Sequence, residues 1–131
     1  MSVEADLYGI LVGSTSVAAL SSQRIYPTLL PQNTVYPAIS YLRISSERYP
    51  LMGGDAVNVA SRFQVDCWDD DALGSRTLAN TVRQALQRYG SSTGTVTIDT
   101  IFIDQQQEIP ERDLDEDIYR VSFDFLIHYR E

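Results

Sequence analysis

The fold is decided by residues 57–89, which read VNVASRFQVDCWDDDALGSRTLANTVRQALQRY and predict one long strand, an acidic turn and one long helix. Residues 57–68 alternate between a mostly apolar set and a mostly polar set. That period of two is typical of a strand with one buried face. The predicted buried face consists of Val57, Val59, Ser61, Phe63, Val65 and Cys67.

An acidic triplet, Asp69-Asp70-Asp71, follows the strand. A carboxylate at this point can accept the free N–H groups of a helix start and is favoured by the positive end of the helix dipole. The triplet therefore predicts a helix cap. The helix after it has apolar residues at helical spacing, and Gly90 is the predicted end. These apolar residues are Leu78, Val82, Ala85, Leu86 and Tyr89.

The remaining elements are predicted as partners for this strand and helix. They are a helix at 3–12, a short helical turn at 17–20, and strands at 38–46, 95–104 and 118–130. Residues 24–37 contain Pro27 and Pro31 and are predicted as a short extended piece and a loop. Residues 105–117 are polar, with six acids from Glu108 onward, and are predicted as a mobile loop.

The order helix, strand, strand, helix, strand, strand predicts a single α+β domain over residues 1–131. Its two layers are a mainly antiparallel sheet of four or more strands and two helices on one face of that sheet. The simplest topology pairs 38–46 with 57–68 as an antiparallel hairpin. The strand at 118–130 is the most regular, with aromatic and aliphatic residues at alternate positions.

The composition argues against several classes of function. The net charge is −8, and all ten basic residues are arginine. A protein this acidic is a poor ligand for nucleic acid or for an anionic membrane, since both bind mainly through cationic groups. Its one cysteine, Cys67, excludes an internal disulfide and falls on the predicted buried face. No apolar run approaches the ~20 residues of a membrane span, and we expect no signal peptide because the first residues are not basic.

We predict no catalytic, cofactor or metal site. The one histidine, His128, shares a strand with Ser122, and six residues of strand separate them by about 20 Å, too far for a triad. One histidine and one cysteine on different elements do not make a zinc site. The acidic triplet is more typical of a helix cap than of a Mg²⁺ or Ca²⁺ site, because consecutive carboxylates point in different directions.

The connection between the first two predicted strands carries Tyr49, Leu51 and Met52. Bulky side chains at the tip of a hairpin often mark a contact surface. The sequence leaves two interpretations open, an interface with another protein or a loop folded back on the core.

The order of these features resembles the tail completion proteins of long-tailed bacteriophages, a group that includes tail-to-head joining and tail-terminator proteins. The resemblance covers nearly the whole chain, and it rests on the order and spacing of five segments. They are Arg24-Ile25-Tyr26-Pro27 with Pro31-Gln32, Tyr36-Pro37-Ala38-Ile39-Ser40-Tyr41, Arg62-Phe63-Gln64-Val65-Asp66-Cys67-Trp68, residues 78–86, and Tyr119-Arg120-Val121-Ser122-Phe123-Asp124-Phe125.

The resemblance implies a structural virion protein that is not an enzyme. Such a protein assembles into a ring, commonly a hexamer, at the head-proximal end of the tail after synthesis in the host cytoplasm. The ring ends polymerisation of the tail tube and joins the tail to the head-side connector, and DNA passes through it without specific binding. Acids of the 105–117 segment are candidates for the lumen wall: Glu108, Glu111, Asp113, Asp115, Glu116 and Asp117.

Two alternatives remain at this stage. Within the structural class, the chain could be a head-side connector or stopper protein, or a minor tail tube protein. From another class, it could be a small α+β ligand-binding domain or enzyme, for which a pocket around His128 or Cys67 would be the expected sign.

Overall fold

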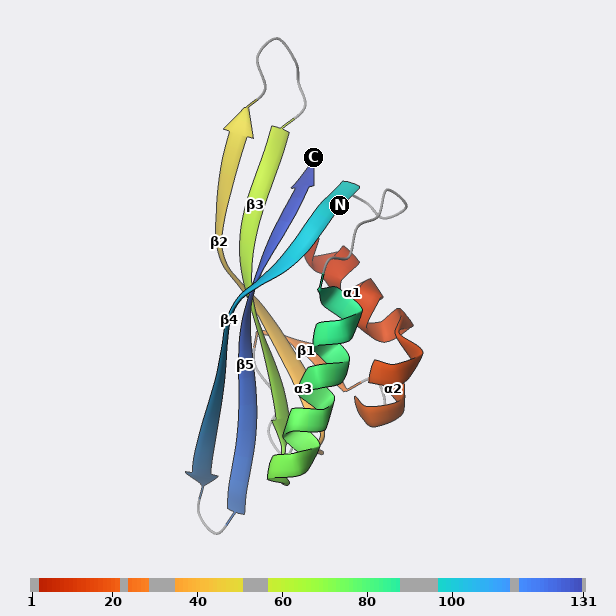
Figure 1. The fold of residues 1–131 in the computed structure, drawn as a ribbon, viewed down its shortest axis with the longest axis vertical. Coiled ribbons are helices and arrows are strands. Elements are labelled where there is room, and N and C mark those ends of the chain that lie inside the picture. Colours follow the sequence, from red (N-terminus) through yellow and green to blue (C-terminus); the bar gives the residue numbers. More distant parts are fainter. Residues whose placement is uncertain are drawn as a thin grey trace.

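A computed structural model of the protein describes residues 3–21, 24–28, 35–50, 57–87, 97–113 and 116–130. Three helices and five strands follow one another along these residues (Figure 1). In chain order they are α1 (Val3–Gly13), α2 (Thr15–Ser21), β1 (Ile25–Pro27), β2 (Ala38–Pro50), β3 (Val57–Asp69), α3 (Ala72–Leu86), β4 (Thr97–Asp113) and β5 (Glu116–Arg130).

The strands form one sheet in the order β1-β2-β3-β5-β4. The predicted hairpin is confirmed, since β2 pairs antiparallel with β3 from Ala38↔Trp68 to Pro50↔Val57. β5 lies between β3 and β4 and is antiparallel to both, whereas β1 runs parallel to β2. The predicted α+β class is therefore confirmed, with β1 as a fifth strand and α2 as a third helix.

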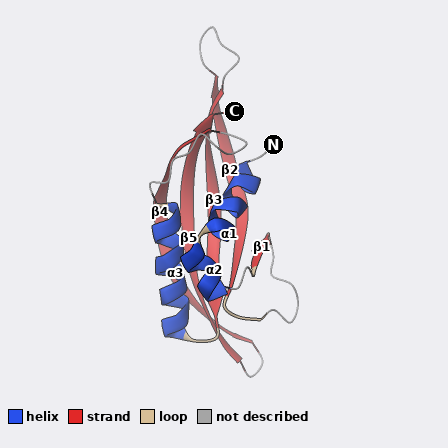
Figure 2. Ribbon diagram, turned by 90° about the vertical axis from the view of Figure 1, so that its right-hand side faces the viewer, coloured by secondary structure: helices blue, strands red, loops and turns tan. Residues whose placement is uncertain are grey.

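The helices cover one face of the sheet (Figure 2), and the core lies between the two layers. The predicted buried face of residues 57–68 is confirmed for the side chains that the structure describes. They are Val59, Ser61, Phe63, Val65 and Cys67, and all five are buried. Fully burying an aliphatic or aromatic side chain contributes about 1.5–3 kcal/mol. The largest fully buried side chains on the two central strands are Phe63 on β3 and Phe123, Phe125 and Ile127 on β5.

The acidic triplet caps α3 as predicted. Asp71 is the N-cap residue, with extended backbone angles, and its Oδ2 accepts a hydrogen bond of 3.0 Å from the Gly74 N–H. The predicted end at Gly90 is wrong: α3 ends at Leu86, and Gln87 already has extended backbone angles. Leu86, the last residue of α3, is buried in the core. Tyr89 and Gly90 lie outside the described residues.

The prediction of a mobile loop at 105–117 is wrong. Residues 105–113 continue β4, and residues 116 and 117 begin β5. Their pairing runs without a break from Gln105↔Asp124 to Asp113↔Glu116. The ladder is made by the backbone, so an edge strand with exposed polar side chains can form it without apolar residues. Pro110 is tolerated because an edge strand leaves one side of its backbone unpaired.

The described helices do not include one that is long and apolar enough to span a membrane by itself. Only α1 and α2 taken together reach that length and composition, and they are bent by 80° relative to each other. Both helices bury apolar residues in the core, including Leu7 and Leu11 of α1 and Val17 of α2.

Replacing Gly74 should test the packing of the acidic turn against α3. A Cβ at Gly74 would overlap the carboxylate of Asp69, whose side chain is held in place by the hydrogen bond that its Oδ1 accepts from the Asp70 N–H. Gly74→Ala should therefore lower the free energy of unfolding by about 1–3 kcal/mol, although alanine ordinarily favours a helix.

The matched control is Gly9→Ala in α1, where a Cβ has no heavy atom within 4 Å. That change should raise the free energy of unfolding by up to about 1 kcal/mol. Urea denaturation followed by circular dichroism measures both. Equal stabilisation by the two substitutions would contradict the overlap with Asp69.

Candidate interaction surfaces

The residues of the predicted catalytic alternative do not meet. Cys67 is buried on the helix side of β3, and burial, with a smaller contribution from Asp66, raises the pKa of its thiol well above the usual range. His128 lies in β5 on the other side of the sheet, and its ring makes a T-shaped contact with that of Phe102 at a centroid distance of 5.7 Å. Within the described residues, no three His, Cys, Asp or Glu side chains are grouped so that they could hold a metal ion.

The predicted interface at Tyr49, Leu51 and Met52 is only partly described. Tyr49 lies near the end of β2, opposite Asn58 on β3, and 53% of it is exposed. Its hydroxyl donates a hydrogen bond to the Glu47 carboxylate, which raises the pKa of Tyr49. Leu51 and Met52 lie outside the described residues. The contact surface therefore stays a prediction, and Tyr49 is its one described member.

The sheet face opposite the helices has no helix over it in the described structure (Figure 1). Phe102 of β4 is 48% exposed there and lies in register with Leu126 of β5, which pairs in turn with Arg62 of β3. The Arg62 guanidinium makes a hydrogen-bonded ion pair of 2.6 Å with Asp104 on β4. This uncovered sheet face therefore combines apolar side chains with ion pairs, a mixture typical of protein–protein contact surfaces.

The same face is hollowed near the start of β2 by a pocket of about 270 Å³. Trp68 forms one wall, and the Arg120 guanidinium lies 4.8 Å from the centroid of its ring. The indole N–H of Trp68 donates to Ser40 Oγ at 3.0 Å, and Asp66 lies 3.8 Å from Arg120. These contacts connect β2, β3 and β5 and stabilise the pocket wall. None of these three contacts pairs a nucleophilic side chain with a general base.

The candidate lumen acids belong to the hairpin of β4 and β5. Glu108, Glu111 and Asp113 are in β4, Glu116 and Asp117 are in β5, and Asp115 lies outside the described residues. Among these acids the structure describes the side chains of Glu108 and Asp117, and both are exposed. The structure therefore places most of these acids on strands and leaves their orientation in an assembly as a prediction.

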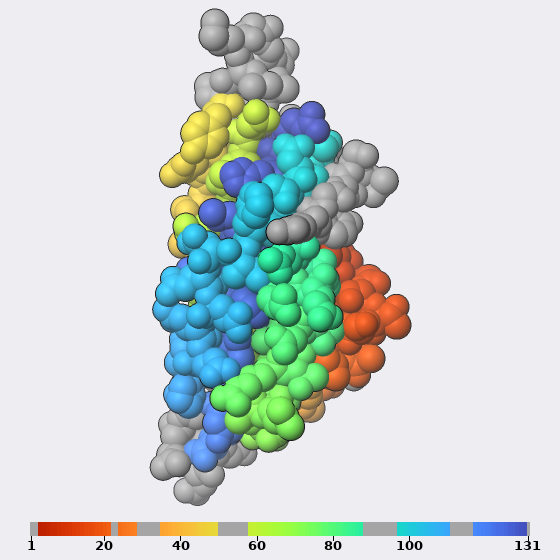
Figure 3. Space-filling model, in the orientation of Figure 1, coloured from red at the N-terminus to blue at the C-terminus, as the bar shows by residue number. Residues whose placement is uncertain are grey.

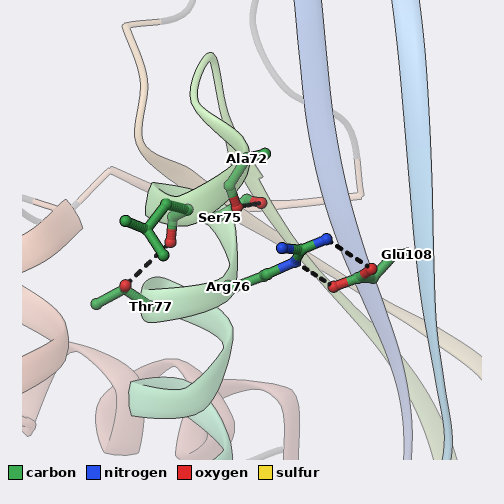
Figure 4. A network of polar contacts seen from close by, with 6 residues as sticks. Ala72, Ser75, Arg76, Thr77 and Glu108 are labelled. Carbon is green, nitrogen blue, oxygen red and sulfur yellow. Dashed lines mark hydrogen bonds and ion pairs between the residues drawn. The ribbon is translucent and has the colours of Figure 1, made fainter.

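Glu108 has a partner that sequence reasoning missed. Figure 4 shows Arg76 reaching from α3 to the Glu108 carboxylate with two hydrogen bonds, 2.8 Å from Nε and 3.3 Å from Nη2. Glu108 accordingly raises the pKa of Arg76. The two residues are separated by 32 positions in the chain, so no local sequence pattern could have paired them.

This ion pair stands beside a groove between the first turn of α3 and β4. The groove contains a pocket of about 140 Å³. Besides the ion pair and Arg120, its lining residues are Ala72, Ser75, Ile109, Pro110, Tyr119 and Val121. In Figure 3 the yellow-green start of α3 lies beside the blue atoms of the hairpin. The groove thus lies where the helix layer stops and the hairpin continues.

Comparison with known proteins identifies the family. The family described as "Tail completion protein gp17" matches residues 5–130 of this chain. The chain belongs to the tail completion protein family. This confirms the resemblance drawn from the order of the sequence segments, and it makes the protein a structural component of a phage-type virion tail.

A solved structure has a similar fold. It is a chain of the "Virion of native gene transfer agent (GTA) particle", with a TM-score of 0.72 and 15% sequence identity. The match covers 95% of this chain and 92% of that chain. Identity this low shows a shared fold. No functionally curated protein sequence matches the chain at a significant level.

The thiol of Cys67 should be inert in the native protein. Burial raises its pKa and blocks access, and only the thiolate reacts rapidly with alkylating reagents. We expect iodoacetamide at pH 8 to leave the native protein unmodified and to label it fully in denaturant, as measured by intact-protein mass spectrometry. Rapid labelling of the native protein would contradict the described position of Cys67 in the core.

Proposed function

We propose that this tail completion protein forms a ring, of six copies, at the head-proximal end of the tail. In this proposal the ring ends polymerisation of the tail tube and joins the tail to the head-side connector. The protein acts as a structural subunit and carries out no catalysis. Its partners are its own copies, the tail tube protein and the connector or stopper protein. Membership of the tail completion family carries the proposal.

The uncovered sheet face supports assembly through protein contacts. Leu42 of β2 is 38% exposed and Phe102 of β4 is 48% exposed, and both lie on the side of the sheet opposite the buried core. Covering such side chains on assembly would contribute free energy in proportion to the apolar area removed from water. A neighbouring subunit is the covering partner in this proposal.

The acidic composition supports passage of DNA without binding. The net charge of −8 per chain would give six copies a formal charge of about −48. Negative charge around a channel repels phosphates, so the genome can move through without adhering. Acids of the hairpin stay our candidates for the lumen wall, with Glu108 on the side of β4 that contacts α3.

Other assignments lead to different observations. A head-side connector or stopper, or a minor tube protein, would occupy another layer of the same assembly. A ligand-binding domain or enzyme would need a working site, yet Cys67 is buried on one side of the sheet and His128 lies on the other. The structural class is therefore the better supported one.

Particles that lack this protein should separate the structural roles. Loss of a terminator should give free tails of uncontrolled length, because nothing stops the tube from growing. Loss of a joining protein should give full heads beside tails of normal length. Negative-stain electron microscopy of the lysate distinguishes the two, and infectious particles with attached tails of normal length would refute both roles.

The predicted contact at the end of the first hairpin can be tested by changing Leu51 and Met52 to Asp together. If these side chains contact a neighbour, the introduced charges should block ring formation on the tube while leaving the fold intact. Electron microscopy and circular dichroism measure the two effects. Asn80→Asp, which adds a charge at an exposed position of α3, is the control and should assemble normally. Normal assembly of the double variant would exclude Leu51 and Met52 from the contact.

A further inference from the structure

The outer edge of β2 is covered by another strand over only part of its length. β1 pairs with residues 39–41 of β2, and the Thr28 N–H then donates a hydrogen bond of 2.7 Å to the Tyr41 carbonyl. Over residues 42–47, β2 has β3 on one side and no strand on its outer side in the described part of the chain. The yellow end of β2 also extends past the helices (Figure 1). A strand edge of this kind can accept a further strand through its backbone groups.

The register shows which backbone groups of this edge point outward. Opposite residues of antiparallel strands direct their N–H and C=O groups either toward each other or both away. The backbone of Tyr41 faces β1, so its partner Val65 faces away from β2, as does every second residue of β3. Ser61 belongs to that set and lies opposite Ser46. The N–H and C=O of Ser46 therefore point outward, where an added strand would lie.

Exposed apolar side chains accompany the same edge. Leu42, Ile44 and Tyr49 of β2 are exposed, and no other strand has more than one exposed large hydrophobic side chain in the described structure. Ile44 is the extra residue of a β-bulge, because the register shifts between Arg43 and Ser45. An exposed edge strand with apolar side chains is prone to pair with another chain.

The other edge of the sheet, β4, has features that block strand pairing. Its two bulges fall at Asp99 and Asp104, whose carboxylates make ion pairs of 3.0 Å with Arg130 and 2.6 Å with Arg62. Farther along β4, Pro110 has no N–H to donate. Bulges, charges and proline are the usual means by which edge strands avoid pairing. The two edges therefore differ, and β2 is the edge suited to a partner strand.

This difference also selects the partner. A second copy could offer its own β2, but pairing of the same edge with itself is two-fold and closes on two subunits, not on a ring. The β4 of a second copy would bring its bulges and Pro110 to the contact. A strand from a different protein meets neither obstacle.

We propose that β2 from Leu42 onward binds an extended segment of a different virion protein, which adds to the sheet as a strand. Hydrogen bonds to the outward backbone groups hold the segment. Its apolar side chains cover Leu42 on the open sheet face and Tyr8 on the helix face, where the Tyr8 ring is exposed and lies 6.4 Å from that of Tyr41. The inference rests on the proposed function for its setting in an assembled tail, and not on ring formation.

Hydrogen–deuterium exchange with mass spectrometry tests for the added strand. A peptide that covers residues 42–47 is compared in the purified protein and in whole virions. Its outward amides should exchange about tenfold more slowly in virions, or slower still, because the added strand pairs them. Equal exchange in both samples would overturn the proposal. The same slowing in the purified protein alone, as rings, would also overturn it, since a second copy would then be the partner.

A proline at position 46 tests the backbone contact directly. Ser46→Pro removes an outward N–H and keeps the pairing with β3, because proline is tolerated where an edge strand faces solvent. The yield of infectious particles should fall by about tenfold or more when this variant replaces the native protein. Its circular dichroism and oligomeric state should stay native. Ser46→Ala keeps the N–H and loses only the hydroxyl beside Ser61, so as the matched control it should stay within about twofold of the native yield.

Gln106→Pro is the control for the other edge. Gln106 is exposed and lies opposite Phe123, which pairs on its other side with Val65, so its backbone also points outward. This variant should assemble normally. A loss as large as that of Ser46→Pro would indicate β4 of a second copy as the partner and would overturn the proposal, as would a native yield from Ser46→Pro. If Ser46→Pro does not fold, the exchange measurement decides.

The outcome is separable from that of the ring proposal. Slowed exchange of residues 42–47 in virions, from a protein that forms no rings, would support the added strand and count against the ring. Rings whose β2 edge exchanges equally fast in virions and in the purified protein would overturn the added strand alone.

Discussion

Burial of one face of β3 and β5 beneath the helices is the interaction on which the rest of the structure depends. Phe63 from β3 and Phe123 and Phe125 from β5 are fully buried, together with Leu78 and Leu86 from α3. Removing one such phenylalanine typically costs about 3–5 kcal/mol, a large fraction of the stability of a domain of this size. This layer fixes the register of the two central strands, because a shift by one residue would turn their apolar faces to water.

The same constraint sets where contacts with other proteins can be made. The helices lie on the face that carries the aromatic core, so the opposite face stays open, with Phe102 and Leu42 exposed on it. The helix layer is also shorter than the sheet, because α3 ends at Leu86 and begins beside the base of the hairpin. The open face and the groove between α3 and the hairpin therefore both arise because the helix layer is shorter than the sheet. For a tail component, such exposed parts are the places where neighbours can bind.

Prediction from sequence was reliable where apolar and polar residues alternate along a strand, and where a capping residue precedes a helix. The alternation in residues 57–68 and 119–129 identified the faces that are buried, and the acidic triplet identified the cap of α3. The prediction failed for residues 105–117, because their polar composition hid strands that are held by backbone pairing with β5. It also placed the end of α3 at Gly90, whereas α3 ends at Leu86 and Gln87 has extended backbone angles.

By itself, the sequence determined the α+β class, the central hairpin, the cap of α3 and, through the order of its segments, the family. Periodicity and capping are local properties, so they can be read from neighbouring residues. Only the tertiary structure decided that Arg76 meets Glu108 and that the Arg120 guanidinium lies over the Trp68 ring. Those contacts join residues far apart in the chain, and their geometry follows from how the helix packs across the sheet.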